Sequence, residues 1–179
     1  MDESENNRLA ELLTELANGN LLVLSEIDFQ MQKTLYKVGY PYYKNKEDTR
    51  DSIQELYLVL HKKAKHFHEN VSARAWMVVV YKNFIKSDFR KRNREKRYIQ
   101  KEMQAFKSQA STTIDKYVES RLVWKEVMDK LNDYEQSLLV YYLQAELTVR
   151  EIAEVLHKPK STIENHLQKV KEKIRKMQK

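Results

Sequence analysis

Glycine and proline, the residues that most readily interrupt helices, are nearly absent from this chain, which contains two of each among 179 residues. Antiparallel β architectures need frequent tight turns, and those turns favour Gly and Pro, whereas the interior of a helix disfavours both. Apolar residues make up 41% of the chain, and 33% of the residues are charged. These proportions suit amphipathic helices, so the sequence predicts an all-α protein.

Apolar side chains recur at helical spacing through the first part of the chain. A first helix is predicted by four leucines that precede the turn at Asn18-Gly19-Asn20, namely Leu9, Leu12, Leu13 and Leu16. A second helix is predicted from about residue 21 to 38, ending at Gly39-Tyr40-Pro41, and a third from about 47 to 66. A long fourth helix is predicted to begin at Ala73, because Ser72 can cap its first turn.

The predicted fourth helix changes character along its length. From Trp76 to Tyr81 nearly every side chain is apolar, so we expect this half to be buried, with Trp76 in the core. The segment from Lys82 to Lys101 carries nine Lys or Arg and two Asp or Glu, a net charge of +7 that equals that of the whole chain. We expect this half to lie in solvent, where clustered cations favour a polyanion because each neutralised phosphate releases counterions. A solvated helix face without a partner is the alternative that charge alone leaves open.

A helix-turn-helix is predicted near the C-terminus. Thr148 and Glu151 have the spacing of a capping box at the start of one helix, and Pro159 ends that helix. A second helix is expected from about Lys160, and its N-terminal end carries polar and cationic groups that can reach base edges in a major groove. These residues are Lys160, Ser161, Thr162, Asn165, His166 and Lys169. Glu164 lies among them: its charge opposes contact with a phosphate, whereas a carboxylate can also accept from cytosine N4, and the sequence leaves both roles open. A helical hairpin that meets only water is the alternative.

The domain organisation follows from where the helical spacing weakens. From about Glu102 to Ser120, Ser and Thr residues interrupt the pattern, and we expect a linker there. The predicted organisation is an N-terminal helical extension at residues 1–20, a first domain at 21–98, a linker at 99–120 and a second domain at 121–179. The predicted fold is therefore all-α, with two small helical domains joined by a linker.

Several classes of protein are disfavoured by the sequence. The chain has no Cys, so it has no disulfide framework, thiol nucleophile or Cys-based zinc site. It has no Gly-rich phosphate loop, and His66-x-His68-Glu69 offers two His without a third ligand. We therefore expect no enzymatic activity, no cofactor and no metal. The acidic N-terminus and the lack of a long apolar run predict a cytoplasmic protein without membrane insertion.

Two blocks of the chain resemble bacterial RNA polymerase sigma factors of the sigma-70 superfamily, in the small extracytoplasmic-function (ECF) layout. Residues 51–60, DSIQELYLVL, resemble the D-x-x-Q-E-x-[FY]-L segment with which the family grips the polymerase clamp. Residues 73–92 contain ARAWM, Lys82-Asn83 and RKR, and resemble the R-A-W-L…[RK]-N…R-R-R segment that reads and helps to open the minus-ten element. Residues 131–175 resemble the C-terminal domain that reads the minus-thirty-five element. Ser87 departs from the family pattern, where Asp is usual, and Asp88 follows one position later.

The resemblance implies a transcription initiation factor that binds core RNA polymerase, directs it to promoters and assists promoter opening. The implied partners are the β′ clamp and β flap of the polymerase, promoter DNA, and an anti-sigma factor that holds a closed, inactive state. The residues implied for polymerase binding are Asp51, Gln54, Glu55 and Leu58. Those expected to contact the minus-ten DNA are His66, Phe67, Asn70, Lys82, Asn83, Lys86, Ser87, Arg90, Lys91 and Arg94. The helix-turn-helix from Thr148 to Lys169 would contact the minus-thirty-five DNA.

A stand-alone DNA-binding regulator is the main alternative function. The segment STIENHL at residues 161–167 also resembles the recognition helix of LuxR-type regulators. Such regulators usually carry a ligand-binding or phospho-acceptor domain, and no alternating strand-helix pattern precedes this segment. A regulator would bind duplex DNA tightly by itself, whereas a sigma factor needs the polymerase.

Overall fold

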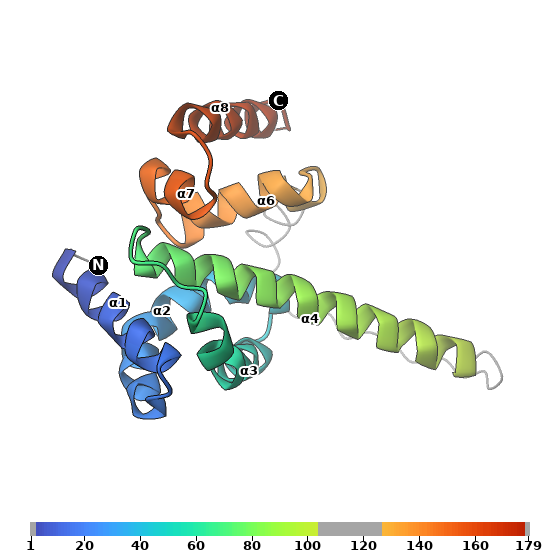
Figure 1. Cartoon of the computed structure of the whole chain (residues 1–179). Coiled ribbons are helices and arrows are strands. Elements are labelled where there is room, and N and C mark those ends of the chain that lie inside the picture. Colours follow the sequence, from blue (N-terminus) through green and yellow to red (C-terminus); the bar gives the residue numbers. More distant parts are fainter. Residues whose placement is uncertain (1–2, 104–126, 178–179) are drawn as a thin grey trace.

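The computed structural model describes residues 3–103 and 127–177, and this part of the chain is helical throughout, without a strand (Figure 1). The first unit contains four α-helices and a short 3-10 helix: α1 (Glu3–Ala17), η1 (Leu21–Val23), α2 (Leu24–Tyr43), α3 (Lys46–Ala64) and α4 (Ala73–Met103). The second unit contains α6 (Asp133–Leu139), a π-helix η2 (Val140–Gln144), α7 (Val149–Val155) and α8 (Lys160–Met177). The all-α prediction is confirmed. The predicted linker at 99–120 falls mostly outside the described residues.

Helix α1, expected as an N-terminal extension, packs into the bundle of the first unit. The side chains of Leu9, Leu12 and Leu13 are 0% exposed, and Leu16 is 1% exposed. They lie against α2, α3 and α4 (Figure 1). The helix ends at the expected turn, where Gly19 has a φ of 97° that favours glycine.

Helix α2 continues past the Gly39-Tyr40-Pro41 sequence, so the predicted end at residue 38 is wrong. Gly39 lies inside the helix and is buried against the Tyr81 side chain. A Cβ at this position would collide with the Tyr81 hydroxyl, so the packing requires glycine here. The Tyr81 hydroxyl is in turn hydrogen-bonded to the Ser52 hydroxyl at 2.7 Å. Pro41 costs one backbone hydrogen bond. Tertiary packing compensates for this loss, since Tyr43 is 8% exposed and its hydroxyl donates to Asp88 at 2.9 Å.

Helix α4 is buried along its first half and leaves the body of the molecule along its second half (Figure 1). Its start is capped as predicted, because the Ser72 hydroxyl accepts from the Ala75 amide at 3.3 Å. Met77 and Tyr81 are fully buried. Trp76 is half-buried against the core and meets the edge of the Phe67 ring, 5.4 Å between centroids.

The second unit is organised by two capping boxes. Asn132 and Glu135 form one at the start of α6, and Thr148 and Glu151 form the predicted one at the start of α7. The turn after α7 places His157 at a φ of 51°, in the left-handed region that usually carries Gly. None of the helices in residues 3–103 and 127–177 has the length and apolarity to cross a bilayer.

Candidate nucleic-acid interface

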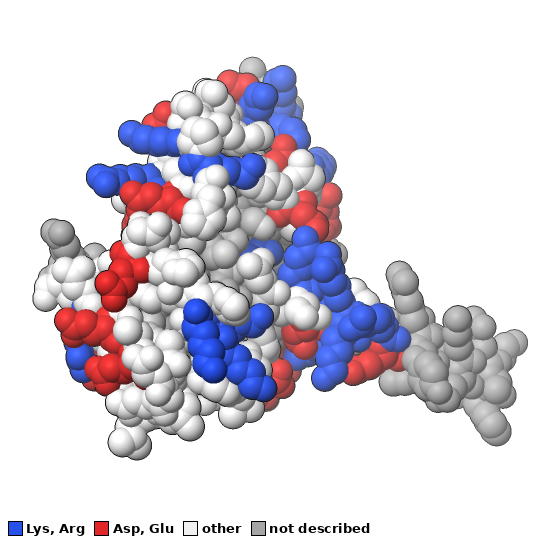
Figure 2. Space-filling model, in the orientation of Figure 1, with Lys and Arg blue, Asp and Glu red and all other residues white. Residues whose placement is uncertain are grey.

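The basic half of α4 presents one polar face to solvent. Asn83, Ser87 and Arg94 are exposed, and the spacing of three to four residues places them on the same side of the helix as Arg90 and Lys91, which are also exposed. Figure 2 shows Lys and Arg side chains gathered where this helix leaves the body. Such a face can follow a phosphate backbone while its amide and hydroxyl groups remain available for bases.

Lys82 and Lys86, at the start of this stretch, lie against the second unit. Lys82 is 8% exposed, and its ammonium group lies 4.6 Å from the centre of the Tyr42 ring. Burial, followed by the nearby charge of Lys86, lowers the pKa of Lys82. The Lys86 ammonium donates to Asp133 at 2.7 Å. The prediction that α4 is wet from Lys82 onward is therefore wrong at Lys82, because the C-terminal end of α2 and the start of α6 cover it.

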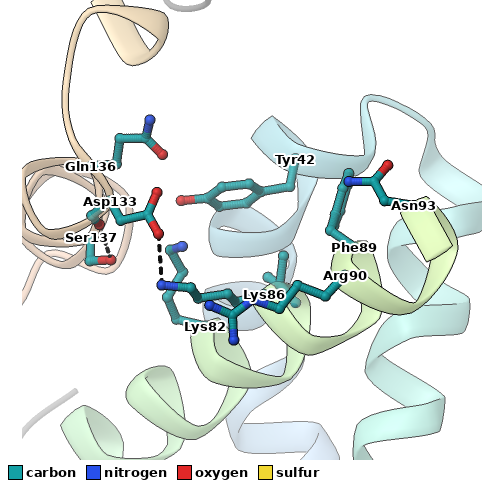
Figure 3. A pocket seen from close by; sticks show the side chains of 10 residues that line it. Tyr42, Lys82, Lys86, Phe89, Arg90, Asn93, Asp133, Gln136 and Ser137 are labelled. Carbon is teal, nitrogen blue, oxygen red and sulfur yellow. Dashed lines mark hydrogen bonds and ion pairs between the residues drawn. The ribbon is translucent and has the colours of Figure 1, made fainter.

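A pocket of about 250 Å³ opens at this junction (Figure 3). The first unit contributes Tyr42, Phe89 and Asn93 together with the three cations Lys82, Lys86 and Arg90. The second unit contributes Asp133, Gln136 and Ser137. In Figure 3 the Asp133 carboxylate and the Tyr42 hydroxyl point toward each other across the pocket. Cations beside two aromatic rings can bind both phosphates and unstacked bases.

Asp88, displaced by one position from the family pattern, supports α4 from inside. It accepts from the Tyr43 hydroxyl at 2.9 Å and pairs with Arg92 at 2.8 Å, while Arg92 lies 5.3 Å from the centre of the Tyr43 ring. The hydrogen bond to Asp88 raises the pKa of Arg92. Arg92 thus ties α4 to α2, which distinguishes it from the exposed Arg90 and Lys91.

The loop before α4 contains three of the residues expected near the minus-ten DNA. Phe67 packs on Trp76, whereas His66 and Asn70 are exposed. In the described residues, no group of three or more His, Cys, Asp or Glu could hold a metal ion. The pair His66 and His68 is therefore not part of such a cluster within residues 3–103 and 127–177.

The outer face of α3 carries the four residues expected to bind polymerase. Asp51, Gln54 and Glu55 are exposed, and Leu58 is 74% exposed. Two grooves meet at Gln54, one lined by Leu21, Asp28 and Tyr57 and the other by Phe29, Tyr36 and Arg50.

Two large apolar side chains that line these grooves were missed from the sequence. Leu21 and Phe29 are 56% and 79% exposed. Phe29 could have been found, since it falls between Ile27 and Met31 and so lies off the buried stripe of α2. Exposed apolar groups clustered beside polar ones are typical of a protein–protein contact.

The helix-turn-helix presents most of its expected residues outward on α8. Lys160, Ser161, Asn165 and Lys169 are exposed, and Thr162 is half-buried. Glu164 is exposed and pairs with Lys160 at 3.5 Å.

His166 differs from the other expected residues of α8. Its ring is half-buried and meets the edge of the Tyr134 ring at 5.2 Å, while the Lys158 ammonium lies 5.4 Å from the centre of the same ring. These contacts place His166 against α6.

Glu135, which is 9% exposed, joins α6 to α8. Its carboxylate accepts from the Asn132 amide at 3.0 Å and pairs with Lys173. The hydrogen bond from Lys173 is the main cause that holds the pKa of Glu135 below its usual value. This residue therefore stabilises the frame on which the helix-turn-helix is built.

Replacing Glu135 with Gln is expected to lower the free energy of unfolding of the second unit by about 1 kcal/mol at neutral pH, since Gln can keep the cap but not the ion pair. The folded-state pKa lies below the unfolded value of about 4.3, so the carboxylate stabilises the fold above that pH. This stabilisation disappears as the pH falls through the folded-state pKa. Hydrogen exchange of the α8 amides should therefore accelerate more steeply on acidification in the parent protein than in Glu135→Gln. Equal acceleration would contradict the assignment.

Comparison with protein families gives two matches that agree with this geometry. A model described as Sigma-70 region 2 matches residues 30–95, and one described as Sigma-70, region 4 matches residues 121–174. Together they cover about two thirds of the chain. The fold and these matches define a promoter-specificity factor of bacterial transcription initiation. The chain belongs to the sigma-70 family and has the ECF-type architecture of regions 2 and 4.

The fold is also that of a solved sigma-factor structure. The structure of CnrH in complex with the cytosolic domain of CnrY matches with a TM-score of 0.64 and 15% sequence identity, covering 94% of this chain and 95% of that chain. No curated protein sequence gives a significant match. Membership of the sigma-70 family means that the chain binds RNA polymerase and promoter DNA, gives the polymerase its promoter specificity and is not an enzyme. It also favours the initiation factor over a stand-alone regulator.

Proposed function

We propose that the outer face of α3 is the surface that binds the β′ clamp of RNA polymerase. The exposed Asp51, Gln54 and Glu55 offer hydrogen-bonding groups on a rigid helix, and the neighbouring Leu58 and Phe29 offer apolar surface. The single observation that supports this proposal is that exposed polar side chains and exposed apolar side chains lie together on one face of the first unit. Apolar anchors surrounded by polar groups are the usual composition of a protein–protein hot spot.

The second part of the proposal concerns the minus-ten element, which α4 would read and help to open. Arg90, Lys91 and Arg94 would neutralise phosphates, and Asn83 and Ser87 would face the bases. The loop with His66, Phe67 and Asn70 would receive unstacked bases, because stacking on rings offsets the loss of pairing. The domain limits proposed for this unit remain residues 21–98, with 1–20 as an extension that packs against it.

The third part concerns the minus-thirty-five element and the β flap, both assigned to the second unit at residues 121–179. Helix α8 would enter the major groove with Lys160, Ser161 and Asn165, while its N-terminal amides favour a phosphate. Thr162, Glu164 and Lys169 would complete the contact, and residues 99–120 would connect the two units. We expect His166 to position α8 through Tyr134.

A reconstituted transcription assay tests the proposed function. Core bacterial RNA polymerase is mixed with a genomic template library, with and without the protein, and the 5′ ends of the transcripts are sequenced. We expect new start sites that share two upstream sequence elements. Transcripts that are the same with and without the protein would refute the proposal. The main alternative, a stand-alone regulator, would instead give tight, sequence-specific duplex binding without polymerase.

Replacing Arg90, Lys91 and Arg94 together with Ala is expected to weaken promoter-complex formation and to flatten its dependence on salt. The slope of log affinity against log salt should fall by about 0.9 for each phosphate that the protein no longer neutralises. Arg92 is left intact because its contact with Asp88 supports the fold. Lys62, Lys63 and Lys65, which are exposed at the end of α3, provide a matched triple-Ala control that removes the same charge. An unchanged slope in the α4 variant would mean that these groups face solvent.

We further propose that the protein acts in the cytoplasm and that an anti-sigma factor controls it. CnrH, which has the same fold, was solved with the cytosolic domain of CnrY bound. The exposed apolar side chains of the first unit offer a comparable protein partner a surface to cover. Affinity purification of the tagged protein from its host should then recover the subunits of RNA polymerase and, in addition, a smaller protein partner.

A further inference from the structure

The pocket between α2, α4 and α6 contains a buried ammonium group that lacks a hydrogen-bond acceptor. The Lys82 side chain is 8% exposed, and its ammonium group lies 4.6 Å from the centre of the Tyr42 ring. Within residues 3–103 and 127–177, this group makes neither a hydrogen bond nor an ion pair. An ammonium group has three donors, and a contact with a ring offsets only part of the cost of burying them. Lys82 is therefore placed to donate to a group held in the pocket.

A second polar group without a partner belongs to the same pocket. The Tyr42 hydroxyl is buried and has no hydrogen-bond partner in the part of the chain that the structure describes. Figure 3 shows it pointing across the pocket, and the Lys82 and Lys86 side chains extend from α4 toward the same space. A hydroxyl that can donate and an ammonium group that must donate are both satisfied by one group with several acceptor atoms.

The charges that line the pocket favour an anion as this group. The lining contains three cations and one carboxylate, which leaves an excess of two positive charges. Lys86 is paired with Asp133 at 2.7 Å, so the excess belongs to Lys82 and Arg90. The volume of about 250 Å³ is several times the roughly 30 Å³ that one water occupies, so a single ordered water cannot fill the pocket. A phosphate group matches both the charge and the need for acceptor atoms.

The remaining lining suits a base beside the phosphate. The rings of Tyr42 and Phe89 both line the pocket, and a base can stack on such rings. Gln136 donates from its Nε2 to the carbonyls of Met128 at 2.8 Å and Leu131 at 3.0 Å. Its Oε1 is thus left as an acceptor for an N–H group of a base. Because ligand sites in proteins usually start at about 300 Å³, a pocket of about 250 Å³ suits one nucleotide and excludes a longer chain.

We propose that this pocket binds a mononucleotide. Its phosphate accepts from Lys82, Arg90 and the Tyr42 hydroxyl, and its base lies against Phe89 and Gln136. The inference goes beyond the proposed function, which needs no small ligand. Of these residues, only Arg90 is also proposed above to neutralise a DNA phosphate.

Isothermal titration calorimetry of the full chain tests the proposal. The probes are AMP, GMP, CMP and UMP, with ribose 5-phosphate and inorganic phosphate as ligands that have no base. We expect at least one mononucleotide to bind with a Kd below about 1 mM. Ribose 5-phosphate and inorganic phosphate should bind about tenfold more weakly, because they lose the stacking on Phe89 and Tyr42. No heat with any mononucleotide, or equal affinity for inorganic phosphate, would overturn the proposal.

Two variants test the groups that lack partners. Lys82→Met should weaken binding of the best mononucleotide about tenfold to a hundredfold, because it removes a charged donor. Tyr42→Phe should weaken it about threefold to tenfold, because it removes a neutral donor. Neither variant should lower Tm, since each removes a buried polar group that has no partner among the described residues. Lower Tm in both variants would mean that the two groups serve the fold, and would overturn the proposal.

The matched control is Lys62→Met, which removes the same charge from an exposed position on α3. We expect it to change mononucleotide affinity less than about twofold, because salt screens so distant a charge. Equal weakening in Lys62→Met and Lys82→Met would mean that only net charge matters, and would overturn the proposal.

The outcome is separable from that of the proposed function. A short DNA duplex is titrated into the parent protein and into Lys82→Met. If Lys82→Met weakened duplex binding while no mononucleotide bound the parent, Lys82 would serve DNA alone and the pocket proposal would fail. Sequence-specific transcription starts in the reconstituted assay would still support the proposed function in that case.

Discussion

Replacing Leu12 with Ala is expected to lower the free energy of unfolding of the first unit by about 2–5 kcal/mol, because a fully buried leucine would leave a cavity. The effect tests whether α1 belongs to the folded core of this unit. Denaturation in urea, followed by far-UV circular dichroism, measures the change. The matched control is Leu22→Ala, which removes the same atoms from a side chain that is 88% exposed.

The control should change stability by less than about 0.5 kcal/mol, as most surface substitutions do. If Leu12→Ala were equally mild, α1 would be a loosely attached segment. The total stability of small domains is about 5 kcal/mol at the lower end of the usual range. If Leu12→Ala lost that much stability, much of the protein would be unfolded at 37 °C. Removing α1 should then abolish transcription activity through unfolding of the first unit.

Replacing Leu58 with Asp is expected to weaken binding to core RNA polymerase by about 2–4 kcal/mol, or roughly 30- to 1,000-fold, if this side chain is an anchor of the contact. The side chain is 74% exposed in the free protein, so the substitution should leave the fold intact. Gln54→Ala with Glu55→Ala should weaken binding in the same direction. Fluorescence anisotropy of the labelled protein, titrated with polymerase, measures the affinity.

The control for this experiment is Lys63→Asp. Lys63 is exposed on the same helix, and its position in the sequence turns it away from the face that carries Gln54 and Leu58. We expect it to bind polymerase nearly as well as the parent protein. Unaltered polymerase affinity in Leu58→Asp, with a normal circular dichroism spectrum, would remove α3 from the contact.

Local patterns in the sequence predicted most of the helices. The leucines of α1, the Ser72 cap and the Thr148–Glu151 capping box depend on residues a few positions apart, and they were found. The predicted end of α2 at residue 38 was wrong because the helix continues to Tyr43, whose hydroxyl donates to Asp88, 45 positions away in the sequence. Local rules for Gly and Pro cannot include such a contact.

In the candidate site, too, features that depend on neighbouring residues were predicted, and features that depend on long-range contacts were not. The exposed face of α3 and most outward residues of α8 followed from helical spacing. The burial of Lys82 and the pairing of Lys86 with Asp133 did not, because they depend on the second unit packing against α4. Spacing within one helix identifies which side chains share a face, but it contains no information on what covers that face.

The continuity of α4 has a mechanical consequence. Its 31 residues, from Ala73 to Met103, span about 46 Å at about 1.5 Å per residue, and the end near Met77 is buried in the core while the other end projects. Because the helix is long and continuous, a small tilt at its buried end produces a larger displacement at its projecting end. Substitutions around Tyr81 and Gly39, which contact no nucleotide, would then shift the basic C-terminal end of α4. Changes deep in the hydrophobic interior could thereby alter which promoters are used.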